Sequence, residues 1–136
     1  MFLGVLSSGE RKLFAQLLYE VAHIDGDFSE PERNQLGVYL KEMEVGWDVI
    51  EDEHLPINNL AQKLAASSEI AKKAMMIELV ALVYADGEYS ESERKTIESV
   101  CSAFSFSDQY IQEITEWVNE ITPIYIKGYS LAGWTR

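Results

Sequence analysis

The sequence contains few of the residues that cross-link a chain or interrupt regular structure. Its 136 residues include 1 cysteine, 3 prolines and 8 glycines. A single cysteine excludes an intramolecular disulfide and is typical of a reducing compartment such as the cytoplasm. Low glycine and proline, with 47% hydrophobic residues, exclude a disordered or collagen-like chain. We therefore expect one cytoplasmic domain over residues 1–136.

Positive charge is also scarce. The chain has 11 Lys and Arg against 23 Asp and Glu, which gives a formal net charge of -12. Nucleic acids and anionic membrane surfaces are bound by clustered Lys and Arg, so this balance opposes both kinds of partner. The longest apolar run, residues 79–85, is about a third of a membrane span. We expect no nucleic-acid partner and no membrane span, and the charge favours cations or a basic protein as partners.

Catalytic motifs are missing as well. The sequence has no GxGxxG, no P-loop, no HExxH and no CxxC. A carboxylate pair acting as acid and base is the remaining enzymatic alternative, and acidic pairs arise easily in a chain with 23 acids. We predict that the protein is not an enzyme.

Apolar residues recur at helical spacing almost throughout, and no segment shows the strict alternation of a half-buried strand. The sequence predicts an all-α fold, a compact bundle of about seven helices. The last helix is expected to start after Ser107 and to end at Pro123, because proline lacks the N–H that continues a helix. The aromatic tail, residues 124–136, is expected either to pack along the body or to remain an apolar tail. The other helices are expected at about 7–24, 30–43, 47–53, 56–65, 68–85 and 91–104.

An internal repeat occurs at an offset of 61 residues. Residues 25–36 read DGDFSEPERNQL and residues 86–97 read DGEYSESERKTI, with six of twelve positions identical. Matching apolar positions continue on both sides of this stretch. The repeat predicts two helix–loop–helix units, at about 8–44 and 68–105, related by a pseudo-two-fold axis.

The repeated loop has two interpretations. In the architectural one, Gly26 and Gly87 end a helix in the left-handed conformation, and a serine with a glutamate three residues later caps the next helix. In the functional one, the loop carboxylates bind a divalent cation, because calcium and magnesium prefer oxygen ligands. Two histidines and one cysteine are too few for a typical zinc site, so calcium or magnesium is expected over zinc. The loop is not an EF-hand, since its glycine and glutamate positions differ from that motif.

The loop also resembles a known family. An apolar helix that ends in Ala-Asp-Gly, followed by a small polar cap and a glutamate, resembles the TerB-like proteins of tellurite resistance; residues 84–93 (YADGEYSESE) match well, and residues 24–32 (IDGDFSEPE) match with isoleucine for alanine. The resemblance implies a duplicated bundle of about seven helices, a non-enzymatic role in metal or chemical stress, and acidic residues that bind a divalent metal. The candidate metal ligands are Asp25, Asp27, Glu32, Asp86, Glu88 and Glu93.

Two further acidic features have open roles. Glu78 is the sole charge in residues 74–85, a helix that is otherwise apolar all round, so we expect it to be paired or partly exposed. Residues 42–53 carry six acids and no base. They form either a solvated acidic face or a docking patch for a basic partner, with Trp47, Val49 and Ile50 as its apolar contact. The alternative to cation binding is therefore a helical protein–protein interaction module whose loops are only helix caps.

Overall fold

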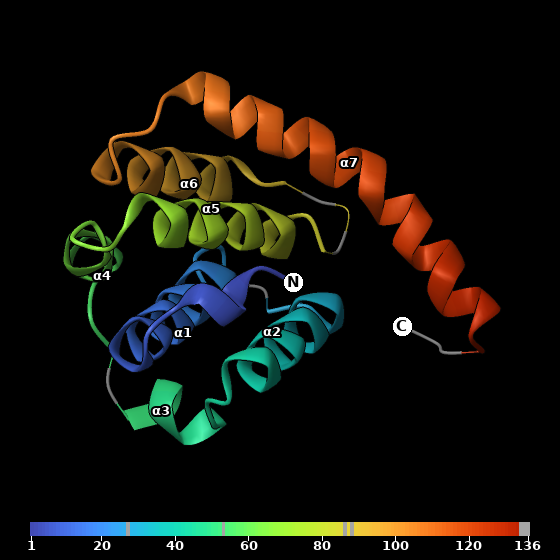
Figure 1. Ribbon diagram of the computed structural model, residues 1–136, viewed down its shortest axis with the longest axis horizontal. Coiled ribbons are helices and arrows are strands. Elements are labelled where there is room, and N and C mark those ends of the chain that lie inside the picture. The colour runs from blue at the N-terminus through green and yellow to red at the C-terminus, as the bar shows by residue number, and fades with distance from the viewer. Residues whose placement is uncertain (27, 53, 86, 88, 134–136) are drawn as a thin grey trace.

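The computed structural model describes residues 1–26, 28–52, 54–85, 87 and 89–133 (Figure 1). Over these residues the chain forms a short 3-10 helix and seven α-helices, with no strand. The predicted all-α fold is confirmed. The elements in order are η1 (Leu3–Val5), α1 (Ser8–Ala22), α2 (Glu30–Met43), α3 (Trp47–Asp52), α4 (Ile57–Leu64), α5 (Glu69–Val83), α6 (Glu91–Ala103) and α7 (Asp108–Leu131).

Serine residues cap the beginnings of α1, α2, α5, α6 and α7. At Ser7, Ser29 and Ser90 the arrangement is a full capping box. In each box the serine Oγ accepts the N–H of the glutamate three residues later, and that glutamate accepts the serine N–H. Each box satisfies two backbone donors that have no partner within the helix. The predicted capping boxes are confirmed, and so are the bounds of α2.

Helix α5 is the centre of the molecule. It packs against α1, α2, α6, α7 and η1, and Figure 1 shows it between the layer of α1 and α2 and the layer of α6 and α7. Apolar side chains on all of its sides are buried, which accounts for the absence of a polar face in its sequence. These side chains include Met75, Met76, Leu79, Val80, Leu82 and Val83.

The last helix continues past the proline at which the sequence predicts its end. Pro123 lies inside α7, which extends to Leu131, so the predicted end is wrong. Proline's fixed φ is itself helical, and its cost of about 3 kcal/mol in a helix interior comes from the missing N–H and from the clash of its ring with the carbonyl four residues earlier. Nearby, the Thr122 hydroxyl donates a hydrogen bond to the Val118 carbonyl at 2.6 Å. Figure 1 shows α7 bent along its length, and its end is exposed, with Ile124 at 66% and Leu131 at 79%.

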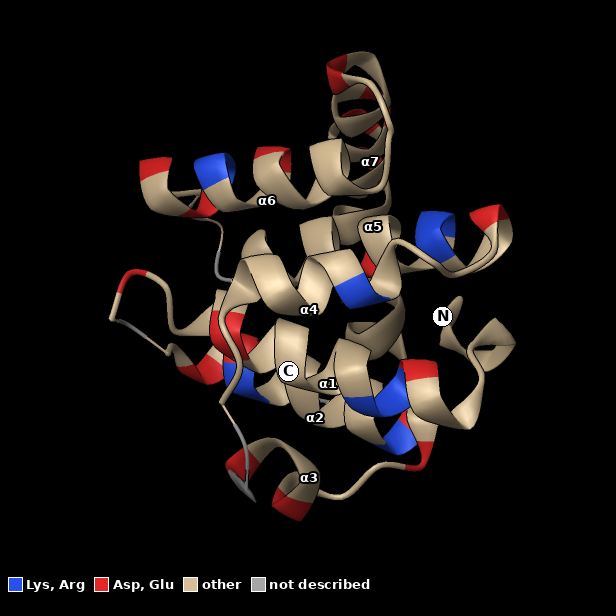
Figure 2. Cartoon of the chain, turned by 90° about the vertical axis from the view of Figure 1, so that its left-hand side faces the viewer, with Lys and Arg blue, Asp and Glu red and all other residues tan. Residues whose placement is uncertain are grey.

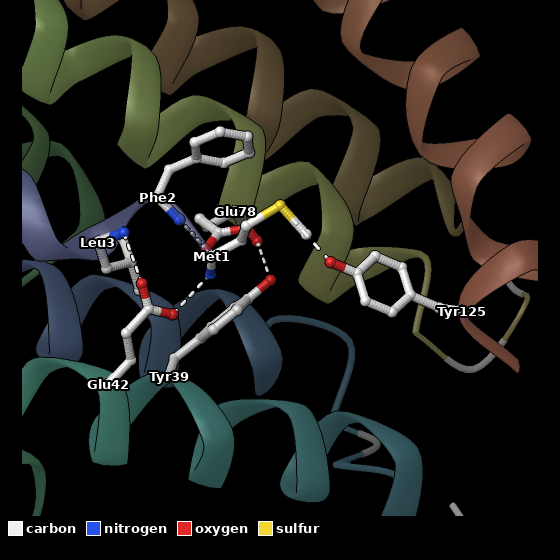
Figure 3. Close-up of polar contacts among 7 residues, drawn as sticks. All are labelled: Met1, Phe2, Leu3, Tyr39, Glu42, Glu78 and Tyr125. Atoms are coloured by element: carbon white, nitrogen blue, oxygen red, sulfur yellow. Dashed lines mark hydrogen bonds and ion pairs between the residues drawn. The ribbon is translucent and has the colours of Figure 1, made fainter. Parts of the chain in front are cut away.

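The buried carboxylate of Glu78 holds the beginning of the chain against α5. Glu78 is 4% exposed. It accepts hydrogen bonds from the Met1 ammonium at 2.6 Å and the Phe2 N–H at 3.2 Å (Figure 3). Glu42 of α2 accepts from the same ammonium at 2.6 Å and from the Leu3 N–H at 2.8 Å. The expected pairing of Glu78 is confirmed, and its partner is the first amine of the chain rather than a lysine or arginine.

This ion pair predicts that stability falls at alkaline pH. Burial lowers the pKa of the Met1 ammonium, but hydrogen bonds to Glu42 and Glu78 and their negative charges outweigh it, so the pKa lies above its usual value of 8.0. A raised folded-state pKa contributes stability that is complete below about pH 8 and is lost as the pH rises through the folded value. We expect the unfolding temperature to fall as the pH rises above about 8. In Glu78→Gln the fall should be shallower, and an equal slope in both proteins would contradict the assignment.

Candidate functional site

The described parts of the two repeated loops match in the conformation of their glycines and in the packing of their rings. Gly26 and Gly87 both have φ of 79°, the left-handed conformation that glycine adopts without a steric penalty. The rings of His23 and Phe28 lie 4.3 Å apart between centroids, and the equivalent rings of Tyr84 and Tyr89 lie 4.6 Å apart. In each repeat, a pair of aromatic rings therefore packs together where one helix ends and the next begins.

The correspondence continues to the ends of the second helices. Glu44 and Ser105, again 61 positions apart, have φ of 58° and 63°. The residue after each donates its N–H back to the helix: Val45 to the Leu40 carbonyl at 2.9 Å, and Phe106 to the Cys101 carbonyl at 3.0 Å. This is the same helix-terminating motif in both units. The pseudo-two-fold arrangement of the two units stays a prediction.

Two of the predicted ligands, Glu32 and Glu93, are buried helix-capping residues. They are 2% and 4% exposed. Glu32 Oε1 accepts from the Ser29 N–H at 3.3 Å and from the Ser29 hydroxyl at 2.9 Å. Glu93 Oε1 accepts from the Ser90 N–H at 3.0 Å. Helix capping therefore accounts for one oxygen, Oε1, of each carboxylate.

Of the remaining predicted ligands, the structure describes only Asp25. Asp25 is exposed, while Asp27, Asp86 and Glu88 lie outside the described residues. Among the residues that the structure describes, no group of three or more His, Cys, Asp or Glu side chains is arranged to hold a metal ion. The metal site stays a prediction.

A groove that the sequence did not predict lies beside both loops. It has a volume of about 1000 Å³ and runs between α2, α5 and the second half of α7. Glu30 at the start of α2 and Tyr84 at the end of α5 both line it, so each loop borders it. Its walls are largely apolar and aromatic, and the only charged side chains among its described lining residues are Glu30 and Glu78. The aromatic lining residues are Tyr39, Tyr84, Trp117, Tyr125 and Tyr129.

Hydrogen bonds fix part of the groove wall. The Tyr39 hydroxyl donates to the Glu78 carbonyl at 2.9 Å, which ties α2 to α5 (Figure 3). The Tyr125 hydroxyl donates to the Met1 sulfur at 3.5 Å, which brings α7 toward the beginning of the chain. The only hint of this wall in the sequence was the unexplained aromatic segment after Pro123.

Burial raises the pKa values of three titratable side chains, Tyr84, Tyr89 and Cys101. Burial, helped by the neighbouring Tyr84 and Glu98, raises the pKa of Tyr89 to about 12. Burial also raises the pKa of Tyr84 and, with Asp108, raises that of Cys101 to about 11. At neutral pH these phenols and this thiol serve as hydrogen-bonding and packing groups rather than as nucleophiles.

The acidic segment 42–53 is only in part the surface that the sequence suggests. Figure 2 shows α3 with acidic residues and no basic ones. Ile50, expected as part of an apolar docking contact, is fully buried, and Trp47 is 37% exposed. Because the helical period places Ile50 in the core, the prediction that Ile50 belongs to an apolar docking contact is wrong.

The fold and the loops together define a class of protein: a small all-helical domain with a repeated, serine-capped Asp-Gly loop. Comparison with known families agrees with this. A family model described as "Tellurite resistance protein TerB" matches residues 11–116, so the chain belongs to the TerB family. No curated protein and no solved structure matches the chain. Both loops lie within the matched residues, whereas the part of α7 that lines the groove lies beyond them.

The capping geometry predicts equal and ion-independent losses of stability. Ser29→Ala and Ser90→Ala each remove a side-chain acceptor from a helix start, so each should lower the free energy of unfolding by about 1 kcal/mol. Urea unfolding with and without divalent cations measures this. Ser92→Ala is the control, because Ser92 is exposed within α6 and caps nothing. A loss at Ser92 as large as that at Ser90 would contradict the capping role.

Proposed function

We propose that this TerB-family chain is a non-enzymatic helical docking module that acts by binding a partner protein in the groove between α2, α5 and α7. The observation that carries the proposal is the groove itself, a hollow of about 1000 Å³ with aromatic and apolar walls. Such a groove suits the apolar face of an amphipathic helix, which places side chains at intervals of three and four residues. The capping roles of Glu32 and Glu93 support the same view, because they leave the loops with an architectural task.

Charge defines the chemistry of the partner. Glu30 and Glu78 are the only charged side chains on the described groove lining, the Met1 ammonium that also lines it pairs with Glu78, and the chain carries a net charge of -12. A partner segment with an apolar face and flanking Lys or Arg is therefore favoured over an acidic one. Tellurite, named in the family description, is an oxyanion, and direct capture of an anion is opposed by this charge. A role in chemical stress would then act through a partner or a cation.

The absence of catalysis is part of the proposal. Cys101 is buried with a pKa of about 11, and Tyr89 has a pKa of about 12. Neither supplies a nucleophile or a base near neutral pH. We therefore expect the groove to bind a partner through surface contact and hydrogen bonds, and not to transfer protons.

A helical peptide of leucine and lysine, about 18 residues long, is a suitable probe for the groove. We expect it to change the fluorescence of Trp117, which lines the groove, while the same peptide with glutamate for lysine does not bind. Val38→Glu should weaken the binding at least about tenfold, because a charge on the apolar wall must be desolvated.

Ile70→Glu provides the matched control. Ile70 is 71% exposed at the start of α5 and is not among the groove lining residues, whereas Val38 is 53% exposed and lines the groove. Both variants change the net charge by the same amount. Equal weakening in the two variants would mean that the peptide binds through general charge, and the proposal would be wrong.

A second candidate function, divalent cation binding at the repeated loops, is favoured by the family match. The match covers both loops and stops short of the end of α7. The ligands proposed are Asp25, Asp27, Glu32, Asp86, Glu88 and Glu93, an all-oxygen set that suits calcium or magnesium. A bound ion would screen mutually repelling carboxylates and stiffen the angle between helices, in a chain that we place in the cytoplasm.

Thermal unfolding of chelator-treated protein tests the second candidate. Calcium, magnesium and zinc are titrated separately at fixed ionic strength, so that general screening of the negative charge is not mistaken for a site. We expect a saturable rise in unfolding temperature with calcium or magnesium, lost in Asp25→Asn and Asp86→Asn. No ion-selective rise up to millimolar concentration would leave the loops as architecture alone.

A further inference from the structure

The second half of α7 presents an apolar face that no other helix of the described chain covers. A shallow hollow of about 390 Å³ on this face is lined by α7 and its C-cap residue alone, at Ile121, Ile124, Tyr125, Gly128, Tyr129 and Ala132. Gly128 leaves it open, since no atom beyond its two neighbours and the nearby backbone of its own helix lies within 4 Å of the place where a Cβ would sit. One turn earlier, Ile124 is 66% exposed. The face thus carries a projecting side chain next to a hollow.

The groove and this face are adjoining sides of α7, which share Ile121, Tyr125 and Tyr129. Ile126 lines the groove and is absent from the hollow, whereas Ile124 lines the hollow and is absent from the groove. Two residues along an α-helix turn by about 200°, which agrees with this division. Substitutions at Ile124 and Ile126 therefore test the two sides separately.

Charge indicates what covers the face. The chain carries a net charge of -12, yet residues 121–136 contain no Asp or Glu and include Lys127 and Arg136. Two copies of this chain repel one another through the acidic residues on most of their surfaces, and this acidic repulsion is absent where their acid-free segments meet. An anionic membrane is a poorer partner for the same apolar face, because the rest of the chain is repelled by it.

We propose that the chain forms a two-fold symmetric dimer through this face, with the second halves of two α7 helices packed antiparallel. Ile124 of each copy enters the hollow at Gly128 of the other, so the contact is reciprocal, as a two-fold interface requires. A glycine at the crossing point lets two helix backbones approach closely. The dimer goes beyond the proposed docking function and does not depend on it.

Sedimentation equilibrium over about 1 to 200 µM protein tests the dimer. We expect a reversible monomer–dimer equilibrium in the wild type. Ile124→Glu and Gly128→Leu should each raise the dimer dissociation constant at least about tenfold. Gly128→Leu removes a helix-weakening glycine at an open position, so it should fold at least as well as the wild type. Circular dichroism checks that both variants retain their helices.

Ile126→Glu is the matched control, because it places the same charge on the same helix at a comparably exposed position, 54% against 66% for Ile124. It should leave the dimer intact while weakening the leucine–lysine peptide, and Ile124→Glu should show the reverse. A wild type that stays monomeric at about 200 µM, or equal loss of the dimer in both variants, would overturn the proposal. Flotation of a monomeric wild type with phosphatidylcholine vesicles would overturn it too, because the face would then bind lipid. Loss of peptide binding alone would count only against the docking function.

Discussion

The fold depends on one constraint, met twice: a helix must end, reverse direction and restart within a few residues while its free backbone groups remain hydrogen-bonded. Gly26 and Gly87 supply the left-handed conformation, and the boxes at Ser29 and Ser90 satisfy the first donors of α2 and α6. Because Glu32 and Glu93 serve this purpose from buried positions, much of the acidic pattern in the loops follows from the constraint itself.

A second constraint acts at the centre. Helix α5 is apolar on all sides, so its single buried carboxylate at Glu78 must find partners. It finds them in the Met1 ammonium and the Phe2 N–H, and Tyr39 binds the backbone carbonyl of the same residue. These contacts hold η1, α2 and α5 together, and α2 and α5 in turn form two walls of the groove.

The third wall of the groove is formed by α7. Helix α7 continues beyond Pro123 and presents apolar side chains on two adjoining faces, one in the groove and one beside it. The family match ends at residue 116, so these surfaces belong to a part of the chain outside the matched region. A TerB-type core that carries the loops is thus joined to an additional helical arm, and both interactions that we propose use that arm.

The sequence by itself determined the local structure. The helical spacing, the serine caps of α2 and α6, the apolar character of residues 74–85 and the family could all be predicted, because each depends on residues close together along the chain. Only the tertiary structure decided what happens between distant segments: the partner of Glu78, the burial of Ile50, the continuation of α7 through Pro123 and the groove. The physical reason is that each of these depends on which distant surfaces meet. A capping serine finds its partner three residues away, whereas the 41 and 77 residues that separate Met1 from Glu42 and Glu78 are closed only by packing.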